Sequence, residues 1–229
     1  MQQWDSRHAI TDHLGRAAES VVVNLANASA SISIGAKLKS LDYSLGSTLE
    51  CASCFDIAEI KRLLDGEVAA KHKKSLAEIF SMMMGLQNSW SRQIVREDGV
   101  EYAAETNTAS KQVRFNHEQL DVYAVALEAV RWFCRSDFSA ILPVGLFRKL
   151  DSLSTSIVLN IAEGNGRYTE KDQRSFLQIA HQSAIKFAAQ LDLCILKGLL
   201  SSNEADVGKN LLFRVASMTA AMIRSERRR

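Results

Sequence analysis

An internal repeat is the feature of this sequence that most constrains its fold. When the chain is aligned with itself at a shift of 136 residues, as from Leu14 to Leu150, the two halves register without a gap over most of their length. Polar residues match as well as apolar ones, which two unrelated amphipathic helices would not do in one register. The matched polar pairs include Ser20 with Ser156, Asn24 with Asn160, Asp56 with Asp192, Lys61 with Lys197 and Lys73 with Lys209. The sequence therefore predicts two copies of one structural unit.

Apolar residues in the second half recur every three or four positions, which is the period of an amphipathic helix. Four such series run from Leu120 to Cys134, from Leu146 to Ile157, from Phe176 to Ile195 and from Val207 to Met222. Short links between helices make neighbours run in opposite directions. The single proline of the chain, Pro143, also suits long helices. We therefore predict an all-α protein of two antiparallel up-and-down helical bundles.

The first copy matches only three of the four helices, because Met1 aligns with Asp137 and the counterpart of the helix at residues 116–135 is missing. The predicted units are a degenerate three-helix repeat at 1–93, with helices near 5–28, 31–64 and 67–92, a polar linker at 94–114, and a four-helix repeat at 115–229. A missing helix leaves an apolar groove that needs a cover. We expect a homo-oligomer with Leu38, Leu45 and Leu49 as interface candidates.

Two local patterns carry further predictions. In the segment Ala162–Thr169, either Gly164 or Gly166 is expected to adopt the left-handed conformation that ends a helix, and Thr169 to cap the next one. Asn24 and Asn160 fall beside the apolar stripes. They are interpreted as buried polar residues that hydrogen-bond across each bundle, with a binding role as the alternative.

One segment resembles a known family. The run SIVLNIAEGNGR from Ser156 to Arg167, followed by FLQIA at 176–180 and by Ser183, is similar to a family of bacterial four-helix bundles. This family includes proteins encoded in intervening sequences of 23S ribosomal RNA genes and the accessory variability determinants of diversity-generating retroelements. The first copy shares the resemblance only through the repeat, since Asn27–Ala30 replaces the acid and the glycines.

The resemblance implies a ring-like homo-oligomer without enzymatic activity. For the retroelement branch it also implies binding to nucleic acid and a reverse transcriptase as partner. The residues themselves predict no catalytic site, cofactor or metal, because the histidines are scattered and Cys51 and Cys54 lack two further zinc ligands. No apolar stretch is long enough for a membrane span, so we expect a cytoplasmic protein.

Basic residues form three clusters that are candidates for contacting nucleic acid, with a solvated helix face as the alternative. The candidates are Lys71, Lys73, Lys74, Arg167, Lys171, Arg174, Arg224, Arg227, Arg228 and Arg229. Without the three terminal arginines the net charge falls from +2 to −1, so the excess positive charge belongs to the tail. The predicted function is a non-enzymatic accessory or scaffold protein that binds RNA or DNA. The alternative is a structural homo-oligomer without a nucleic-acid role.

Overall fold

The computed structural model describes residues 9–97 and 115–225, and these residues form helices and no β-strand. We call residues 9–97 the first repeat and residues 115–225 the second repeat. The first repeat consists of α1 (Ile10–Ala30), α2 (Ile34–Ile60) and α3 (Gly66–Glu97). The second consists of the short 3-10 helix η1 (Asn116–Gln119), α4 (Asp121–Arg135), α5 (Phe138–Ile141), α6 (Val144–Asn165), α7 (Glu170–Leu196) and α8 (Ser202–Ser225). The predicted all-α class is confirmed.

The helix boundaries follow the sequence repeat. Helices α2 and α7 each have 27 residues, and both of their ends lie 136 positions apart. Their caps also correspond, because Ser33 Oγ accepts a hydrogen bond from the Ala36 amide and Thr169 Oγ1 accepts one from the Asp172 amide. A side-chain cap of this kind satisfies an amide that the first helical turn leaves unpaired. The prediction that Thr169 caps its helix is therefore confirmed.

The prediction of a left-handed glycine before this cap is wrong. Gly166 has φ of −86°, and Gly198 is the glycine with positive φ among the described residues. Gly164 and Gly166 instead allow close packing. A side chain on Gly166 would place its Cβ 2.4 Å from Leu49 Cδ1, and one on Gly164 would come 3.1 Å from Phe176 Cβ.

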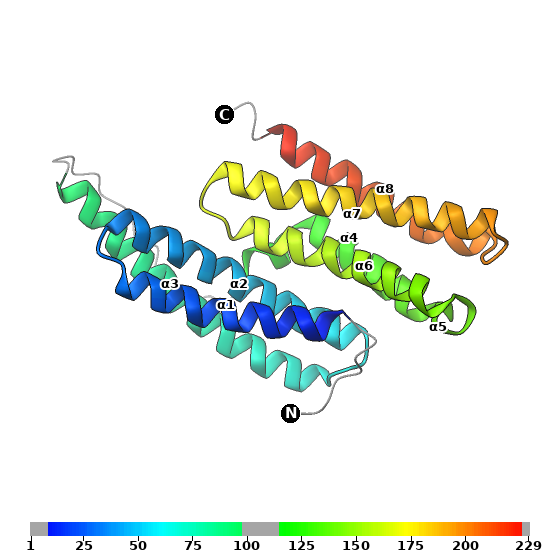
Figure 1. The fold of residues 1–229 in the computed structure, drawn as a ribbon, viewed down its shortest axis with the longest axis horizontal. Helices are drawn as coiled ribbons and strands as arrows, with labels where there is room; N and C mark the ends of the chain where they lie inside the picture. Colours follow the sequence, from blue (N-terminus) through cyan, green and yellow to red (C-terminus); the bar gives the residue numbers. More distant parts are fainter. Residues whose placement is uncertain (1–8, 98–114, 226–229) are drawn as a thin grey trace.

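The two repeats pack against each other through α2, which contacts both α6 and α4 (Figure 1). The main apolar core belongs mostly to the second repeat, but Ile10, Cys54 and Ile57 of the first repeat are part of it. Helix α4 packs on α6 and α8 and has no counterpart among the described residues of the first repeat. Helix α3 extends to Glu97, so the predicted linker begins as helix, and its residues 98–114 lie outside the described part. No described helix is both long and apolar enough to cross a membrane.

Candidate assembly and nucleic-acid surfaces

The two repeat-equivalent asparagines make the same local hydrogen bonds. Asn24 Nδ2 donates to the Ser20 carbonyl oxygen at 2.9 Å, and Asn160 Nδ2 donates to the Ser156 carbonyl oxygen at 2.7 Å. Both side chains are half-buried. The prediction that they bond across the bundle is therefore wrong, because each amide reaches back to the preceding turn of its own helix.

Serine pairs connect the neighbouring helices instead. The hydroxyl oxygens of Ser20 on α1 and Ser47 on α2 lie 2.7 Å apart, and those of Ser156 on α6 and Ser183 on α7 lie 3.0 Å apart. A one-turn slip of either helix would break these bonds. The pairs therefore help to fix the register of the two helix hairpins.

A polar network joins the two repeats near the N-terminal end of α3. Lys73 Nζ lies 2.6 Å from Asp56 Oδ1 and 2.5 Å from Glu118 Oε1. Tyr123 donates its hydroxyl proton to Asp56 Oδ2 at 2.7 Å. Although burial lowers it, the neighbouring carboxylates of Asp56 and Glu118 raise the pKa of the Lys73 ammonium. Lys73 is thus committed to an internal network, which argues against its predicted contact with nucleic acid.

His117 completes this network from η1. Its Nε2 lies 3.2 Å from Ser53 Oγ, and burial lowers the pKa of the imidazole to about 3, so the ring is neutral at ordinary pH. Ligand atoms of Asp56, His117 and Glu118 lie within 4.8 Å of one another, as in a metal site. The Lys73 ammonium already lies against both carboxylates, so a metal ion would have to displace it. The geometry is that of a structural cluster.

The equivalent ion pair of the second repeat has no such cover. Lys209 Nζ lies 2.5 Å from Asp192 Oδ1, as Lys73 does from Asp56, but the two side chains are 35% and 52% exposed. Among the described residues, nothing from another repeat reaches this pair in the way that Glu118 and Tyr123 reach the first one. The same ion pair is therefore partly covered in the first repeat and more exposed in the second.

Apolar residues around this second ion pair are also exposed. They are Ile185 (51%), Leu193 (44%), Leu196 (82%) and Phe213 (72%). Their equivalents Leu49, Ile57 and Ala77 are at most 4% exposed, and Ile60 packs against the main core. We call these four residues, with Asp192 and Lys209, the α7/α8 face. It repeats the surface that the first repeat uses to contact the second.

Helix α1 is exposed on the side where its equivalent α6 is covered. Val22 and Val23 are 68% and 49% exposed, whereas Val158 and Leu159 are 0% and 2% exposed. Part of this difference follows from α4, which packs on α6 and has no counterpart among the described residues of the first repeat. We call Val22 and Val23 the α1 face.

The leucines proposed for an interface lie elsewhere. Leu45 packs in a cluster with Ala28 and Leu41, and Leu49 packs with Phe115, so both are buried within one chain. Leu38 is half-buried. The interface prediction does not fit Leu45 or Leu49, because both side chains are covered by residues of their own chain.

Arg167 was expected to contact nucleic acid, but it lies in the contact between the repeats. Its guanidinium stacks between the rings of Tyr43 and Phe176, with Cζ 4.9 and 4.6 Å from their centroids. Glu163 forms an ion pair with it, and Asp42 Oδ2 lies 3.7 Å from Nη1. Only 9% of the residue is exposed, so Arg167 is not available to a phosphate backbone. The prediction that Arg167 contacts nucleic acid is therefore wrong.

The carboxylates around Arg167 are affected by the same burial. Burial raises the pKa of Glu163 to about 7, although the Arg167 guanidinium opposes the shift. Gly46 makes room for the arginine, because a Cβ at this position would lie 2.9 Å from Cζ of Arg167. The sequence signal that could have identified this site is the pairing of an acid and an arginine four residues apart, at 163 and 167.

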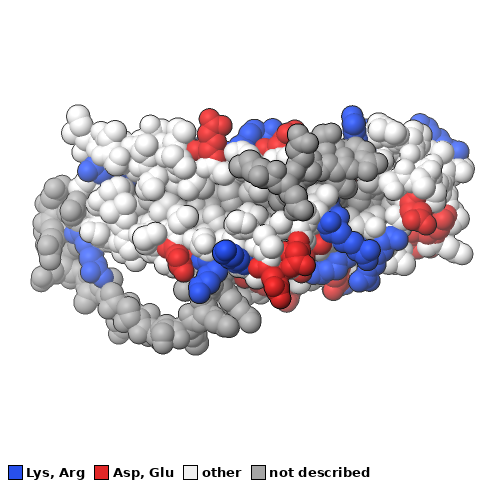
Figure 2. Space-filling view, turned by 90° about the horizontal axis from the view of Figure 1, so that it is seen from below, with Lys and Arg blue, Asp and Glu red and all other residues white. Residues whose placement is uncertain are grey.

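The remaining basic candidates do not form one surface. Lys71, Lys74, Lys171 and Arg224 are exposed, Arg174 is half-buried and engaged with other residues, and Arg227, Arg228 and Arg229 lie outside the described residues. On the face shown in Figure 2, the largest group of Lys and Arg side chains has acidic side chains on both sides. The described body therefore carries mixed charge.

Comparison with known proteins supports the repeat. The model of the family described as 23S rRNA-intervening sequence protein matches residues 2–85 and, a second time, residues 118–221. A search of curated proteins and a search of solved structures gave no match. The two matched regions contain most of α1 to α3 and of α4 to α8, respectively.

Proposed function

The chain belongs to the 23S rRNA-intervening sequence protein family, and from this premise we propose that it is a non-enzymatic scaffold that assembles head to tail with further copies of itself. The observation that carries this proposal is the α7/α8 face. Its repeat-equivalent surface on α2 and α3 is covered within the chain by α6, η1 and α4. The chain therefore contains one example of the contact by which a second chain would bind.

The internal contact indicates which surface the second chain would offer. In the chain, α2 packs on α6. Since α7 is equivalent to α2 and α1 is equivalent to α6, the same contact between two chains places α7 of one chain on α1 of the next. Val22 and Val23 are exposed apolar residues of α1, and Leu159, the equivalent of Val23, lines a cavity together with Tyr43 and Ser47 of α2.

The energetics favour a cover for the α7/α8 face. Full burial of one Leu, Ile or Phe side chain is worth about 1.5 to 3 kcal/mol. Burial of four such residues would stabilise the contact by several kcal/mol, which offsets part of the entropy lost when two chains associate. Because the two contacting surfaces differ, the contact is heterologous and generates a closed ring or an open filament.

Light scattering at micromolar concentration tests the proposal. We expect the wild-type protein to have a mass that is a multiple of 25.4 kDa, and Phe213→Glu to reduce it to the monomer. Val144→Glu is the matched control, because Val144 is an exposed apolar residue outside both faces. A wild-type protein that is monomeric under these conditions contradicts the proposal.

A second function is binding to RNA or DNA with a reverse transcriptase as partner protein, as the resemblance to retroelement accessory proteins implies. The support from the chain itself is the arginine tail, together with the exposed Lys71, Lys74, Lys171 and Arg224.

Deletion of Arg227 to Arg229 tests this second function. We expect the deletion to remove most binding. The slope of log affinity against log salt concentration should fall by the amount that about three phosphate contacts contribute. Filter binding to a short RNA over a salt series measures both effects. Unchanged binding by the truncated protein would show that the tail is not the contact.

A further inference from the structure

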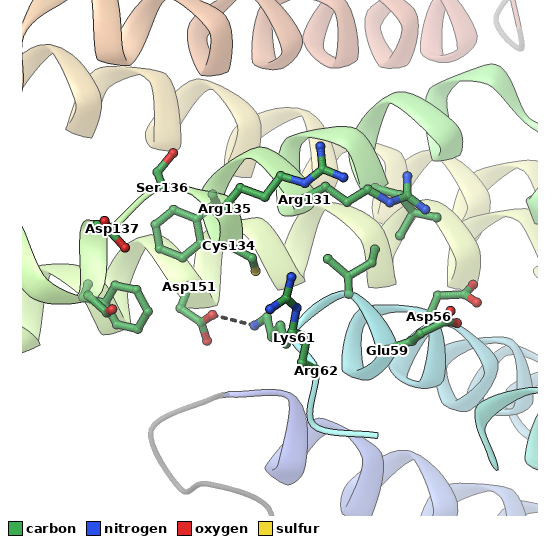
Figure 3. A pocket seen from close by; sticks show the side chains of 15 residues that line it. Asp56, Glu59, Lys61, Arg62, Arg131, Cys134, Arg135, Ser136, Asp137 and Asp151 are labelled. Atoms are coloured by element: carbon green, nitrogen blue, oxygen red, sulfur yellow. Dashed lines mark hydrogen bonds and ion pairs between the residues drawn. The ribbon is translucent and has the colours of Figure 1, made fainter. Parts of the chain in front are cut away.

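A cavity of about 690 Å³ lies between the repeats, where the end of α2 faces α4 and α6 (Figure 3). Three arginines line it: Arg62 follows α2, and Arg131 and Arg135 lie one turn apart on α4. Among the described residues, no hydrogen bond or ion pair engages any of the three guanidinium groups. The three residues are exposed, so they bring to one cavity three positive charges that no described residue pairs with.

Two of the four acids that line the cavity form ion pairs with lysines. Asp151 forms a buried ion pair with Lys61, with Nζ 2.5 Å from Oδ1, and the dashed line in Figure 3 marks it. Asp56 binds Lys73 in the network described above. Glu59 and Asp137 also line the cavity, and among the described residues neither carboxylate forms an ion pair. The three arginines therefore outnumber the two lining carboxylates, Glu59 and Asp137, that no lysine engages.

The backbone at Arg62 gives an independent reason to assign its side chain a role. Arg62 has φ of +55°, and its repeat equivalent, Gly198, has φ of +67°. Left-handed backbone is unstrained for glycine but costs energy for a residue with a Cβ. The second repeat uses glycine at this helix end, whereas the first repeat holds an arginine there despite the strain. Strained residues that persist in a structure are often functional.

We propose that this cavity binds the phosphate group of an organic phosphate, with Arg62, Arg131 and Arg135 as its ligands. Guanidinium groups match phosphate oxygens in geometry and charge. The volume falls within the usual range for small-molecule sites and is larger than a phosphate ion needs. Ile60, Leu127 and Phe147 supply an apolar part of the lining for the organic group.

Isothermal titration of the full chain at low salt tests this proposal. The probes are adenosine monophosphate, unphosphorylated adenosine, inorganic phosphate and a short single-stranded RNA. We expect adenosine monophosphate to bind at least tenfold more tightly than adenosine. Arg62→Gly and Arg131→Gln should each weaken it at least tenfold. Lys186→Gln, an exposed charge on α7, is the matched control and should leave binding unchanged.

Arg62→Gly separates binding from folding, because glycine already occupies the equivalent backbone at Gly198. We expect its thermal unfolding midpoint to be no lower than that of the wild type while its affinity falls. If the RNA loses affinity by the same factor, the natural phosphate is that of a nucleic acid; if only the nucleotide does, it is a free nucleotide. The proposal is overturned if no phosphate-bearing probe binds the wild type at millimolar concentration, or if Arg62→Gly and Arg131→Gln bind as the wild type does.

Discussion

Arg62 and Gly198 show how positions 136 residues apart reveal the role of single residues. Both have positive φ at the end of an equivalent helix, but only Gly198 does so without a Cβ. A contrast of the same kind separates Lys73, which is shared by two carboxylates between the repeats, from Lys209, which is exposed. At these positions, comparing a residue with its equivalent in the other repeat shows which features of its environment are specific to one repeat.

The strain at Arg62 predicts the stability of a variant. Replacing Arg62 with glycine removes a strain of about 1 to 2 kcal/mol, while the added freedom of the unfolded chain costs about 0.4 to 1 kcal/mol. We therefore expect Arg62→Gly to be as stable as the wild type or about 1 kcal/mol more stable, as measured by urea unfolding. A loss of stability well beyond about 1 kcal/mol would mean that the arginine makes stabilising contacts within the chain.

Burial of His117 predicts a dependence of stability on pH. Its pKa is about 3 in the folded protein, while an unfolded histidine titrates near 6.5. As pH falls below about 6.5, the unfolded chain takes up a proton that the folded chain does not. This stabilising contribution is therefore complete above that pH and is lost by up to about 1.4 kcal/mol per pH unit as pH falls toward 3.

Urea unfolding at several pH values between 7 and 4 measures this slope. The variant His117→Gln should lose the part of the slope that the imidazole contributes, although it is less stable at pH 7. His72→Gln is the control, because His72 is exposed. Equal slopes for His117→Gln and the wild type would show that His117 is not the linked group.

At the scale of helices, the repeat predicted most of the fold. The Thr169 cap of α7 was predicted, and the equal lengths of α2 and α7 agree with the register of the two halves, although α2 is shorter than the predicted range 31–64. Side-chain environments were harder to predict, because they depend on residues distant in sequence. Arg167 looked like a surface cation, but the residue whose ring it stacks against, Tyr43, is more than a hundred positions away. The α7/α8 face could be identified only when its buried equivalent was seen.

The contact between α4 and α8 depends on a small residue. A Cβ at Gly208 would lie 2.2 Å from the indole ring of Trp132, so the helices could not approach as they do. We expect Gly208→Ala to lower the free energy of unfolding by about 1 to 3 kcal/mol, as overpacking does. Urea unfolding measures the loss, and Trp132→Phe in the same chain should recover part of it. Full stability of Gly208→Ala would mean that the ring moves aside without cost.

At the scale of the molecule, one chain contains a contact between its two repeats. It also exposes two surfaces, the α7/α8 face and the α1 face, that could form a second contact of the same kind between chains. The α7/α8 face is the open equivalent of the surface that contacts the second repeat, and the α1 face is the open equivalent of part of α6. A head-to-tail assembly brings these two faces together. A symmetric dimer would instead pair a face with itself.

Mixing two single-face variants distinguishes these arrangements. Phe213→Glu disables the α7/α8 face and keeps the α1 face, whereas Val23→Glu does the reverse. Each variant alone should be a monomer of 25.4 kDa by light scattering. The head-to-tail account predicts that an equimolar mixture forms a dimer of one chain of each kind, since one intact pair of faces remains. A mixture in which both variants stay monomeric would contradict it.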